Sequence, residues 1–296
     1  MIGQSMRNHP LWAVMLTAVL LTGCMLGPDF VTPTVETPVE YRFDVDEAAV
    51  EVNLKRWDLF DDPILYELVT TSLENNRDVK IAVSRIEEAR ASLGFTKADQ
   101  YPRIDIEGDA RAGNFFGAGR SDTTDTSAFI APTLSWELDF WGKFRRSTES
   151  AQADLLASEY SLRTVQLSLI SEVASTYYRL LDFHRRLRIS ISTLESRMES
   201  LDIIEQRFKE GIIPELDVNQ AQIQKEIAES SIPLYQRQVD QTENALNILL
   251  GRLAGAIRSG ESLSVQLVPP EVPAGLPSPL LERRPDVAQA RCQLRA

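Results

Sequence analysis

Few side chains in this sequence could carry out catalytic or metal-binding chemistry. The 296 residues include two histidines and two cysteines. His9 falls in an N-terminal leader, so a zinc site or a Ser-His-Asp triad would have to be built on His184 alone. A single histidine within a helical pattern is usually a packing or surface residue. We therefore expect no catalytic residues, no metal site and no cofactor, and we do not expect an enzyme.

One of the cysteines has a distinctive sequence context. Leu21-Thr22-Gly23-Cys24 ends an apolar run, Leu11 to Leu21, that has Arg7 ahead of it. The run is too short to span a bilayer and suits the apolar part of a secretion signal. Small residues before a cysteine resemble a bacterial lipobox, which predicts cleavage between Gly23 and Cys24 and a covalent lipid on Cys24. The alternative is an ordinary signal peptide that happens to contain a cysteine.

The residue after the cysteine indicates in which membrane the protein is anchored, and the net charge indicates which partners it can bind. Met25 stands where an aspartate would indicate retention in the inner membrane, so we expect the outer membrane of a Gram-negative bacterium, with the chain extending into the periplasm. The chain has 31 Lys+Arg against 43 Asp+Glu, a net charge of -12. A nucleic-acid-binding protein would carry a basic face, so we expect no nucleic acid partner.

Local sequence patterns predict the elements that follow the lipidated cysteine along the chain. Residues 1–23 form the signal peptide, and residues 24–60, rich in Pro, Thr and Glu, form an extended tether. A first structural repeat then covers residues 61–251. It opens with a helix that begins at Asp62-Pro63 and ends before Tyr101-Pro102.

Two segments with strict alternation follow this helix, at about 102–116 and 128–141. Each has about the length that a tilted strand needs to cross a bilayer, with apolar residues toward lipid and charged residues toward water. The lipid-facing set is Ile104, Ile106, Ala110, Ile130, Leu134, Trp136 and Leu138. A half-buried soluble hairpin shows the same alternation and is an equal alternative on pattern alone. Pro132 is a mild objection to the second strand, since proline cannot donate to the ladder.

A long helical hairpin comes next. Residues 143–210 contain neither Gly nor Pro, and Val173, Leu180, Leu187, Leu194, Leu201 and Phe208 recur at seven-residue intervals. This heptad predicts a coiled-coil helix roughly 100 Å long. Gly211 ends it, Pro214 begins a return helix over about 214–250, and a second, once-interrupted heptad runs along that helix.

A short internal repeat is also visible. Leu73–Val79 and Leu281–Val287 share Leu, Glu, Asp and Val at equivalent positions, and both open a helical pattern after a proline-bearing segment. We interpret residues 252–279 as a linker and residues 280–296 as the start of a second copy of the unit. The chain is therefore expected to stop as that copy begins.

Four stretches carry a resemblance to a known family. They are Gly27-Pro28-Asp29-Phe30, the Ser135 to Lys143 stretch, Ala245 to Gly251, and Gly275-Leu276-Pro277-Ser278 with Leu281 to Asp286. With them the chain resembles the outer-membrane efflux protein family, which is TolC-like, and in particular its lipoprotein branch. The resemblance covers essentially the whole sequence.

The resemblance implies a fold, partners and a role. The fold is mainly α with a membrane β-hairpin, in which a homotrimer combines long coiled-coil hairpins into an α-barrel and strands into an outer-membrane β-barrel. This chain holds the first of two such repeats. The trimer would be a passive exit duct for small molecules such as drugs and toxic compounds. It would dock on a periplasmic adaptor that links it to an inner-membrane transporter.

The resemblance also assigns a role to the hairpin tip, and two alternative functions stay open. Arg207, Gly211, Pro214, Glu215 and Asp217 would form the periplasmic tip that contacts the adaptor, although a plain helix connection is an equal alternative. Family members continue into a second strand pair and hairpin, so we expect a truncated and non-conducting form, because an unclosed sheet leaves backbone groups unpaired in lipid. The rival functions are a periplasmic adaptor and a structural coiled-coil lipoprotein.

Overall fold

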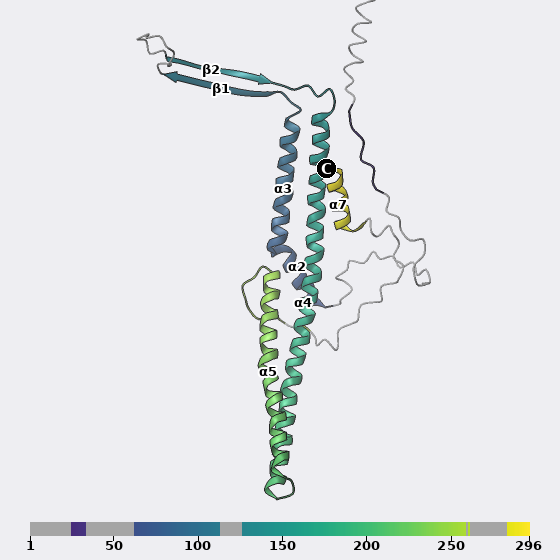
Figure 1. Cartoon of the computed structure of the whole chain (residues 1–296), viewed down its shortest axis with the longest axis vertical. Helices are drawn as coiled ribbons and strands as arrows, with labels where there is room; N and C mark the ends of the chain where they lie inside the picture. The colour runs from purple at the N-terminus through teal and green to yellow at the C-terminus, as the bar shows by residue number, and fades with distance from the viewer. Residues whose placement is uncertain (1–24, 34–61, 113–125, 259, 261–282) are drawn as a thin grey trace, which may run out of the picture. The chain divides into compact units, whose positions relative to one another are not determined.

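The computed structural model describes residues 25–33, 62–112, 126–258, 260 and 283–296. Its elements in chain order are α2 (Pro63–Asn75), α3 (Arg77–Ala98), β1 (Arg103–Ala112), β2 (Thr126–Ser135), α4 (Lys143–Lys209), α5 (Glu215–Leu249) and α7 (Pro285–Arg295) (Figure 1). The predicted signal peptide, Gly23, Cys24, most of the tether and most of the 252–279 linker lie outside the described residues. Within the described part, no helix combines the length and apolarity needed to cross a bilayer.

Contacts divide the chain into two compact units. The first contains Met1–Val35, Arg85–Glu159 and Ala288–Ala296, and the second contains Glu36–Ser84 and Tyr160–Val287. The first unit therefore holds the strand pair and the beginning of α4. The second holds α2, α5 and the remainder of α4.

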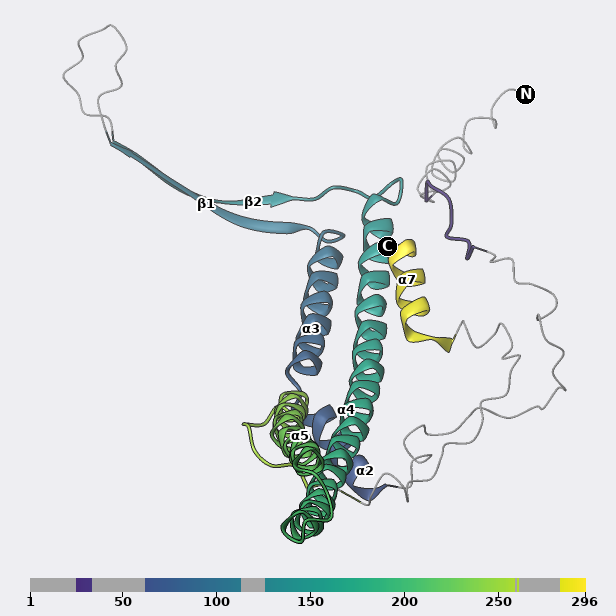
Figure 2. The same ribbon diagram turned by 60° about the horizontal axis from the view of Figure 1, so that its bottom comes forward.

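β1 and β2 form an antiparallel ribbon in the first unit (Figure 2). Directly opposite residues of such a pair lie on the same face. One face combines Ile104 with Leu134, Ile106 with Pro132, Gly108 with Ile130, and Ala110 with Ala128. The other face carries Asp105, Glu107 and Asp109 opposite Thr133, Ala131 and Phe129. The register thus separates an apolar face from a charged face that also carries Arg103, which is the arrangement that the alternation predicts, and Pro132 is part of β2.

The second strand is shorter than predicted. It ends at Ser135, not near residue 141, and Ser135 is paired with Arg103, the first residue of β1. Trp136 therefore has no opposite residue on β1, although the alternation continues through Leu138 and Phe140. The predicted strand residues Trp136 and Leu138 lie instead in the connection from β2 to α4. The first strand also begins at Arg103, one residue after Pro102.

The second unit has one apolar core, to which α2, the start of α3, α4 and α5 contribute. Tyr177, Val173 and Leu180 of α4 are fully buried, as is Leu246 near the end of α5. The remaining buried members are Leu65, Leu68, Val69, Val79, Leu169, Leu181, Val239 and Leu250. The heptad residues Val173 and Leu180 of α4 are thus buried in the region where α2 packs against α4 and α5. The α4–α5 hairpin extends beyond α2 toward its turn (Figure 1), and there Phe208, a later member of the same heptad, is 42% exposed.

The helix predicted from Asp62 to the Tyr101-Pro102 pair is broken at Asn76. Its backbone is extended there, with ψ 139°, and its Oδ1 accepts hydrogen bonds from the N–H groups of Asp78 (2.8 Å) and Val79 (3.3 Å). Its Nδ2 donates to the carbonyl oxygen of Leu249 at 2.9 Å. Asn76 therefore caps α3 and ties that junction to the end of α5, a role that keeps it out of either helix.

The second copy of the internal repeat opens in a similar way. Arg284 holds the place equivalent to Asn76, and it is the one non-helical residue between helical Arg283 and the start of α7 at Pro285. The carboxylate of Asp286 accepts from the Val287 N–H at 3.0 Å. Asn76 and Arg284, which occupy equivalent positions of the predicted repeat, are thus each a single non-helical residue between helical neighbours.

Candidate functional site

The predicted functional residues fall into two separate regions of the described chain. The β1–β2 ribbon and its junction with α4 belong to the first unit, and the turn between α4 and α5 belongs to the second. Each region is described by itself. Cys24, the predicted lipid site, lies outside the described residues.

The apolar face of the ribbon is open. Ile104, Ile106, Ile130 and Leu134 expose between 71% and 82% of their surface. An isolated pair of strands with such a face is marginal in water, and its outer edges present unpaired backbone groups. The ribbon is therefore suited to a larger sheet whose apolar face meets lipid and whose charged face meets water.

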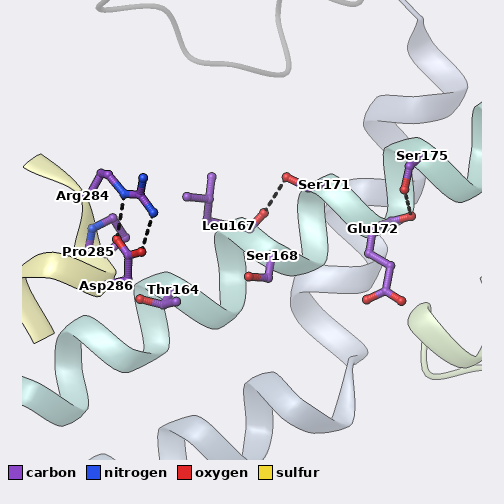
Figure 3. A pocket seen from close by; sticks show the side chains of 9 residues that line it. All are labelled: Thr164, Leu167, Ser168, Ser171, Glu172, Ser175, Arg284, Pro285 and Asp286. Carbon is purple, nitrogen blue, oxygen red and sulfur yellow. Dashed lines mark hydrogen bonds and ion pairs between the residues drawn. The ribbon is translucent and has the colours of Figure 1, made fainter. Parts of the chain in front are cut away.

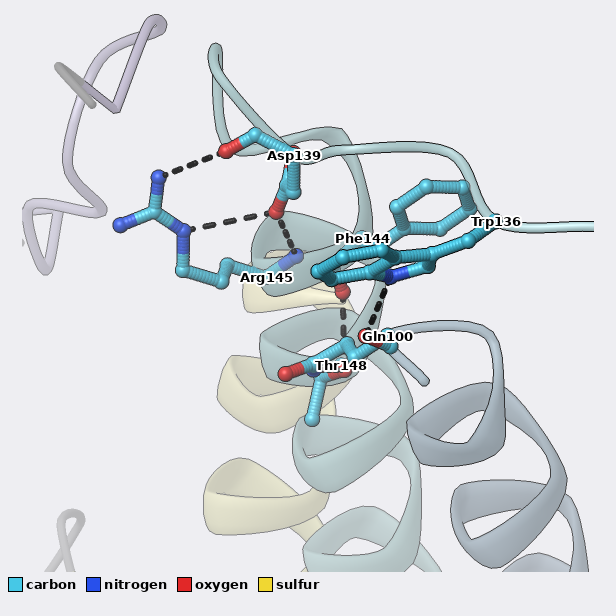
Figure 4. Close-up of polar contacts among 6 residues, drawn as sticks. All are labelled: Gln100, Trp136, Asp139, Phe144, Arg145 and Thr148. Carbon is cyan, nitrogen blue, oxygen red and sulfur yellow. Dashed lines mark hydrogen bonds and ion pairs between the residues drawn. The ribbon is translucent and has the colours of Figure 1, made fainter. Parts of the chain in front are cut away.

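Polar contacts fix the junction between the ribbon and α4 (Figure 4). The indole Nε1 of Trp136 donates to the carbonyl oxygen of Gln100 at 3.3 Å. The Gln100 amide in turn donates to the hydroxyl of Thr148 at 2.6 Å, and that hydroxyl donates to the Phe144 carbonyl oxygen at 2.8 Å. The chain leaving α3, the connection after β2 and the first turns of α4 are thereby held together.

Asp139 caps the first turn of α4 at the same junction. Its Oδ2 accepts from the backbone N–H of Arg145 at 3.0 Å and from the Arg145 guanidinium at 3.4 Å. Burial acts to raise the pKa of Asp139, but the Arg145 N–H and guanidinium outweigh it, so the pKa lies below its ordinary value. Asp139 is thus held as a carboxylate, the charge that the positive end of a helix favours.

Aromatic side chains surround this junction. Trp136 and Trp141 are largely exposed, and the rings of Phe140 and Trp141 meet edge to face with centroids 6.0 Å apart. Exposed aromatic residues of this kind gather at the level of lipid headgroups.

The α4–α5 turn is built around Gly211. Its N–H donates to the Phe208 carbonyl oxygen at 2.9 Å, and the Ile212 N–H donates to the Arg207 carbonyl oxygen at 3.0 Å. This pair of bonds requires the left-handed backbone that Gly211 adopts, with φ +73°. Pro214 then precedes α5, whose first turn carries Glu215 and Asp217.

A shallow groove beside this turn unites only some of the predicted tip residues. Arg207 and Asp217 line it, while Gly211, Pro214 and Glu215 do not. Its other lining residues are Arg197, Ser200, Ile204, Ile213, Gln220, Ala221 and Gln224. Gln220 and Gln224, which follow Asp217 at helical spacing, were not among the predicted tip residues. Neither were Ile212 and Leu216, two strongly exposed apolar residues within or next to a tight turn.

A second groove lies along α4 near the start of α7 (Figure 3). Its serine hydroxyls bond to backbone within α4, from Ser171 to Leu167 and from Ser175 to Glu172. Arg284 and Asp286 pair at 2.6 Å, and this ion pair lowers the pKa of Asp286. Neither the hydroxyls nor this pair forms a nucleophile–base arrangement. Within the described residues, no cluster of three or more metal-ligating side chains occurs.

Comparison with known proteins adds to these features. A family model described as outer membrane efflux protein matches residues 68–252. The probable efflux pump outer membrane protein TtgC of Pseudomonas putida is 33% identical over 302 residues, which cover 97% of this chain and 61% of TtgC. The probable outer membrane lipoprotein SilC of Salmonella typhimurium is 31% identical over 287 residues, which cover 95% of this chain and 61% of SilC.

A solved structure agrees with these relatives. The open state of the Neisseria gonorrhoeae MtrE outer membrane channel matches with a TM-score of 0.76 and 25% identity, covering 92% of this chain and 61% of MtrE. The predicted fold class, mainly helical with strands of a membrane channel, is confirmed. The chain spans 61% of the length of these relatives.

Proposed function

Because the chain belongs to the outer membrane efflux protein family, we propose that it is the outer-membrane channel component of a tripartite efflux pump. The duct would be passive and would release small molecules such as drugs and toxic compounds. TtgC carries the name of an efflux pump outer membrane protein, and SilC that of an outer membrane lipoprotein. The chain is accordingly an outer-membrane protein, and its family is one of transport ducts.

The β1–β2 ribbon is the observation that carries this proposal. Its apolar face is exposed, its opposite face is charged, and a short connection joins its second strand to the 67-residue helix α4. In lipid, the unpaired edges of a two-stranded ribbon need further strands, because no water is there to satisfy their backbone groups. We propose that further strands in a homotrimer supply them and close a barrel.

The hairpin tip is the proposed contact for the periplasmic adaptor, which would connect the duct to an inner-membrane transporter. Leu216 is 71% exposed beside the Gly211 turn, so a partner bound at the tip would touch it. A photo-crosslinking residue at Leu216 is expected to capture the adaptor. The same residue at Ile248, 73% exposed at the opposite end of α5, is the control and should capture none.

The function is tested by export from cells. Deleting the gene in its own host should raise the accumulation of a fluorescent efflux dye, and restoring the gene should lower it again. Dye accumulation that is the same with and without the gene would contradict the channel. Adaptor capture at Leu216 together with unchanged dye accumulation would instead favour a structural coiled-coil lipoprotein.

A further inference from the structure

Two stretches that lie far apart in the sequence meet at the start of α4, within the first unit. The N–H of Leu26 donates to the carbonyl oxygen of Trp141 at 3.1 Å. Nη2 of Arg146 donates to the carbonyl oxygen of Gly27 at 3.3 Å and to Oδ1 of Asp29 at 2.8 Å. Residues 25–29 are therefore bound by backbone and side-chain contacts to the connection that leaves β2.

Gly142 leaves the space in which Met25 lies. It is buried, and a Cβ atom there would fall 2.5 Å from Cγ and 3.2 Å from Cα of Met25. Its φ of +82° also belongs to the region that residues with side chains rarely adopt. Glycine is thus required at position 142 for two reasons. The backbone just before α4 has a positive φ there, and Met25 lies too close to leave room for a Cβ atom.

Arg146 is held in place from its own helix. Its Nη1 pairs with Glu149 at 2.8 Å, so the guanidinium bridges α4 and the N-terminal stretch. The hydrogen bond that Arg146 donates to Asp29, followed by the one it donates to Glu149, raises the pKa of Arg146. Nη1 of the guanidinium donates to Glu149 on α4, and Nη2 donates to the N-terminal stretch. A lysine, with a single side-chain nitrogen, could not reproduce this geometry.

We propose that Trp141, Gly142 and Arg146 form a seat for the residues directly after Cys24. This seat would hold the lipid anchor beside the end of the β1–β2 ribbon that is joined to α4. The inference rests on the proposed lipid on Cys24. Consecutive Cα atoms are about 3.8 Å apart, so the distance between Cys24 and the seat is limited once Met25 is bound there. The anchor and the ribbon would then enter the membrane at a fixed separation.

The surface around the seat suits a bilayer as its occupant. Leu26 and Trp141, joined through their backbones, expose 61% and 67% of their surface. An aromatic and an aliphatic side chain beside an acylated residue match the boundary between headgroups and acyl chains. Two stretches that the sequence singles out, Gly27 to Phe30 and the one that contains Trp141 and Gly142, thus take part in one contact.

Hydrogen exchange of the Leu26 amide tests the seat in the full chain extracted with its lipid. The variants are Arg146→Gln, Gly142→Ala and Asp29→Asn, the last of which lies outside every helix and strand. Lys143→Gln is the matched control, because Lys143 pairs with Glu137 at 2.9 Å and, among the described residues, no hydrogen bond or ion pair joins it to residues 25–29. The mass of the N-terminal peptide reports the lipid in each sample.

In wild type and Lys143→Gln, Leu26 should exchange about tenfold or more slowly than an unprotected amide. Arg146→Gln and Gly142→Ala should lose most of that protection, Asp29→Asn part of it, and the lipid should be present in all. Rapid exchange in lipidated wild type, or protection that survives in every seat variant, would overturn the seat. A protected Leu26 in a chain without lipid would overturn the proposed anchor, and with it the role given to the seat.

Discussion

The hydroxyl of Tyr177 donates a hydrogen bond to Oδ2 of Asp62 at 2.9 Å inside the core of the second unit. Oδ1 of the same carboxylate caps α2 by accepting from Ile64 at 2.9 Å and from Leu65 at 3.2 Å. The Gly260 N–H donates to the Tyr177 oxygen at 3.2 Å. One buried tyrosine therefore connects the middle of α4 with the start of α2 and with the segment after α5.

Replacing Tyr177 with Phe should destabilise the helical unit. The ring would still fill its site, but the buried Asp62 carboxylate and the half-buried Gly260 N–H would each lose a partner. We expect a loss of about 1–3 kcal/mol in the free energy of unfolding. Urea unfolding followed by circular dichroism measures it, and Tyr66→Phe, at an exposed tyrosine of α2, is the control that should change little.

The same pair predicts a dependence on alkaline pH. Burial, then the hydrogen bond and charge of Asp62, raise the pKa of Tyr177 above its ordinary value. The folded chain keeps this proton to higher pH than the unfolded chain, so the stabilisation is complete below about pH 10 and declines above it. The difference in unfolding free energy between wild type and Tyr177→Phe should therefore shrink as pH rises past about 10. A difference that stays constant or grows would contradict the assignment.

Adjacent asparagines offer a matched test of the helix junction. Asn76→Ala removes the cap of α3 and the donor to the Leu249 carbonyl oxygen, and should cost about 1–3 kcal/mol of unfolding free energy. Asn75→Ala removes an exposed bond to Thr71 in its own helix and should cost about 0.5 kcal/mol or less. Equal effects of the two substitutions in urea unfolding would show that Asn76 does not tie the junction.

The glycines of the helical units give a second matched pair. Gly251 has φ +65°, and a Cβ there would lie 2.5 Å from the carbonyl oxygen of Asn75, so Gly251→Ala should destabilise by about 1–3 kcal/mol. Gly94 lies exposed within α3 with nothing near its missing Cβ. Gly94→Ala should therefore be neutral or stabilise by up to about 1 kcal/mol. Thermal unfolding of both variants decides between these outcomes, and a loss at Gly94 would refute the argument.

Local patterns in the sequence predict most of the elements. The stretch without Gly or Pro predicts α4 to within one residue of its observed end, because nothing in it competes with the helix. The alternation predicts which residues of the ribbon share a face, since side chains in a strand alternate with a period of two. Gly211 marks the hairpin turn because the bonds that end α4 require its left-handed backbone.

The elements that the sequence did not predict depend on contacts between distant residues. The break at Asn76 leaves the apolar spacing on both sides intact, and its capping role is completed by Leu249. The end of β2 is set by where β1 begins, which alternation within one strand does not report. The Gln100–Thr148 bond and the Met25–Gly142 contact have no local signature at all. Paired asparagines at 75 and 76 were the one available signal for the helix break.

The two cysteines allow the lipid site to be tested by substitution. Cells grown with labelled palmitate should incorporate the label into wild type and into Cys292→Ser, whose cysteine lies in α7 as a free thiol. Cys24→Ser should lose it, because no other residue of the N-terminal segment can become the acylated terminus. Label that persists in Cys24→Ser, or disappears in Cys292→Ser, would contradict the lipobox.

Neighbouring residues on opposite faces of β1 test whether the ribbon lies in the membrane. Ile106 is on the apolar face opposite Pro132, and Glu107 is on the charged face opposite Ala131. An arginine at a lipid-facing position costs about 2–4 kcal/mol at the bilayer midplane, whereas the water-facing side tolerates charge. Ile106→Arg should therefore reduce the amount of protein in the outer-membrane fraction, measured by density-gradient fractionation and immunoblotting, while Glu107→Arg should leave it near wild type. A soluble half-buried hairpin would bury the same apolar face within the protein, so Ile106→Arg would then lower the free energy of unfolding of protein extracted in detergent. The membrane arrangement predicts the reverse, a defect in membrane recovery with little change in the unfolding of the helical units.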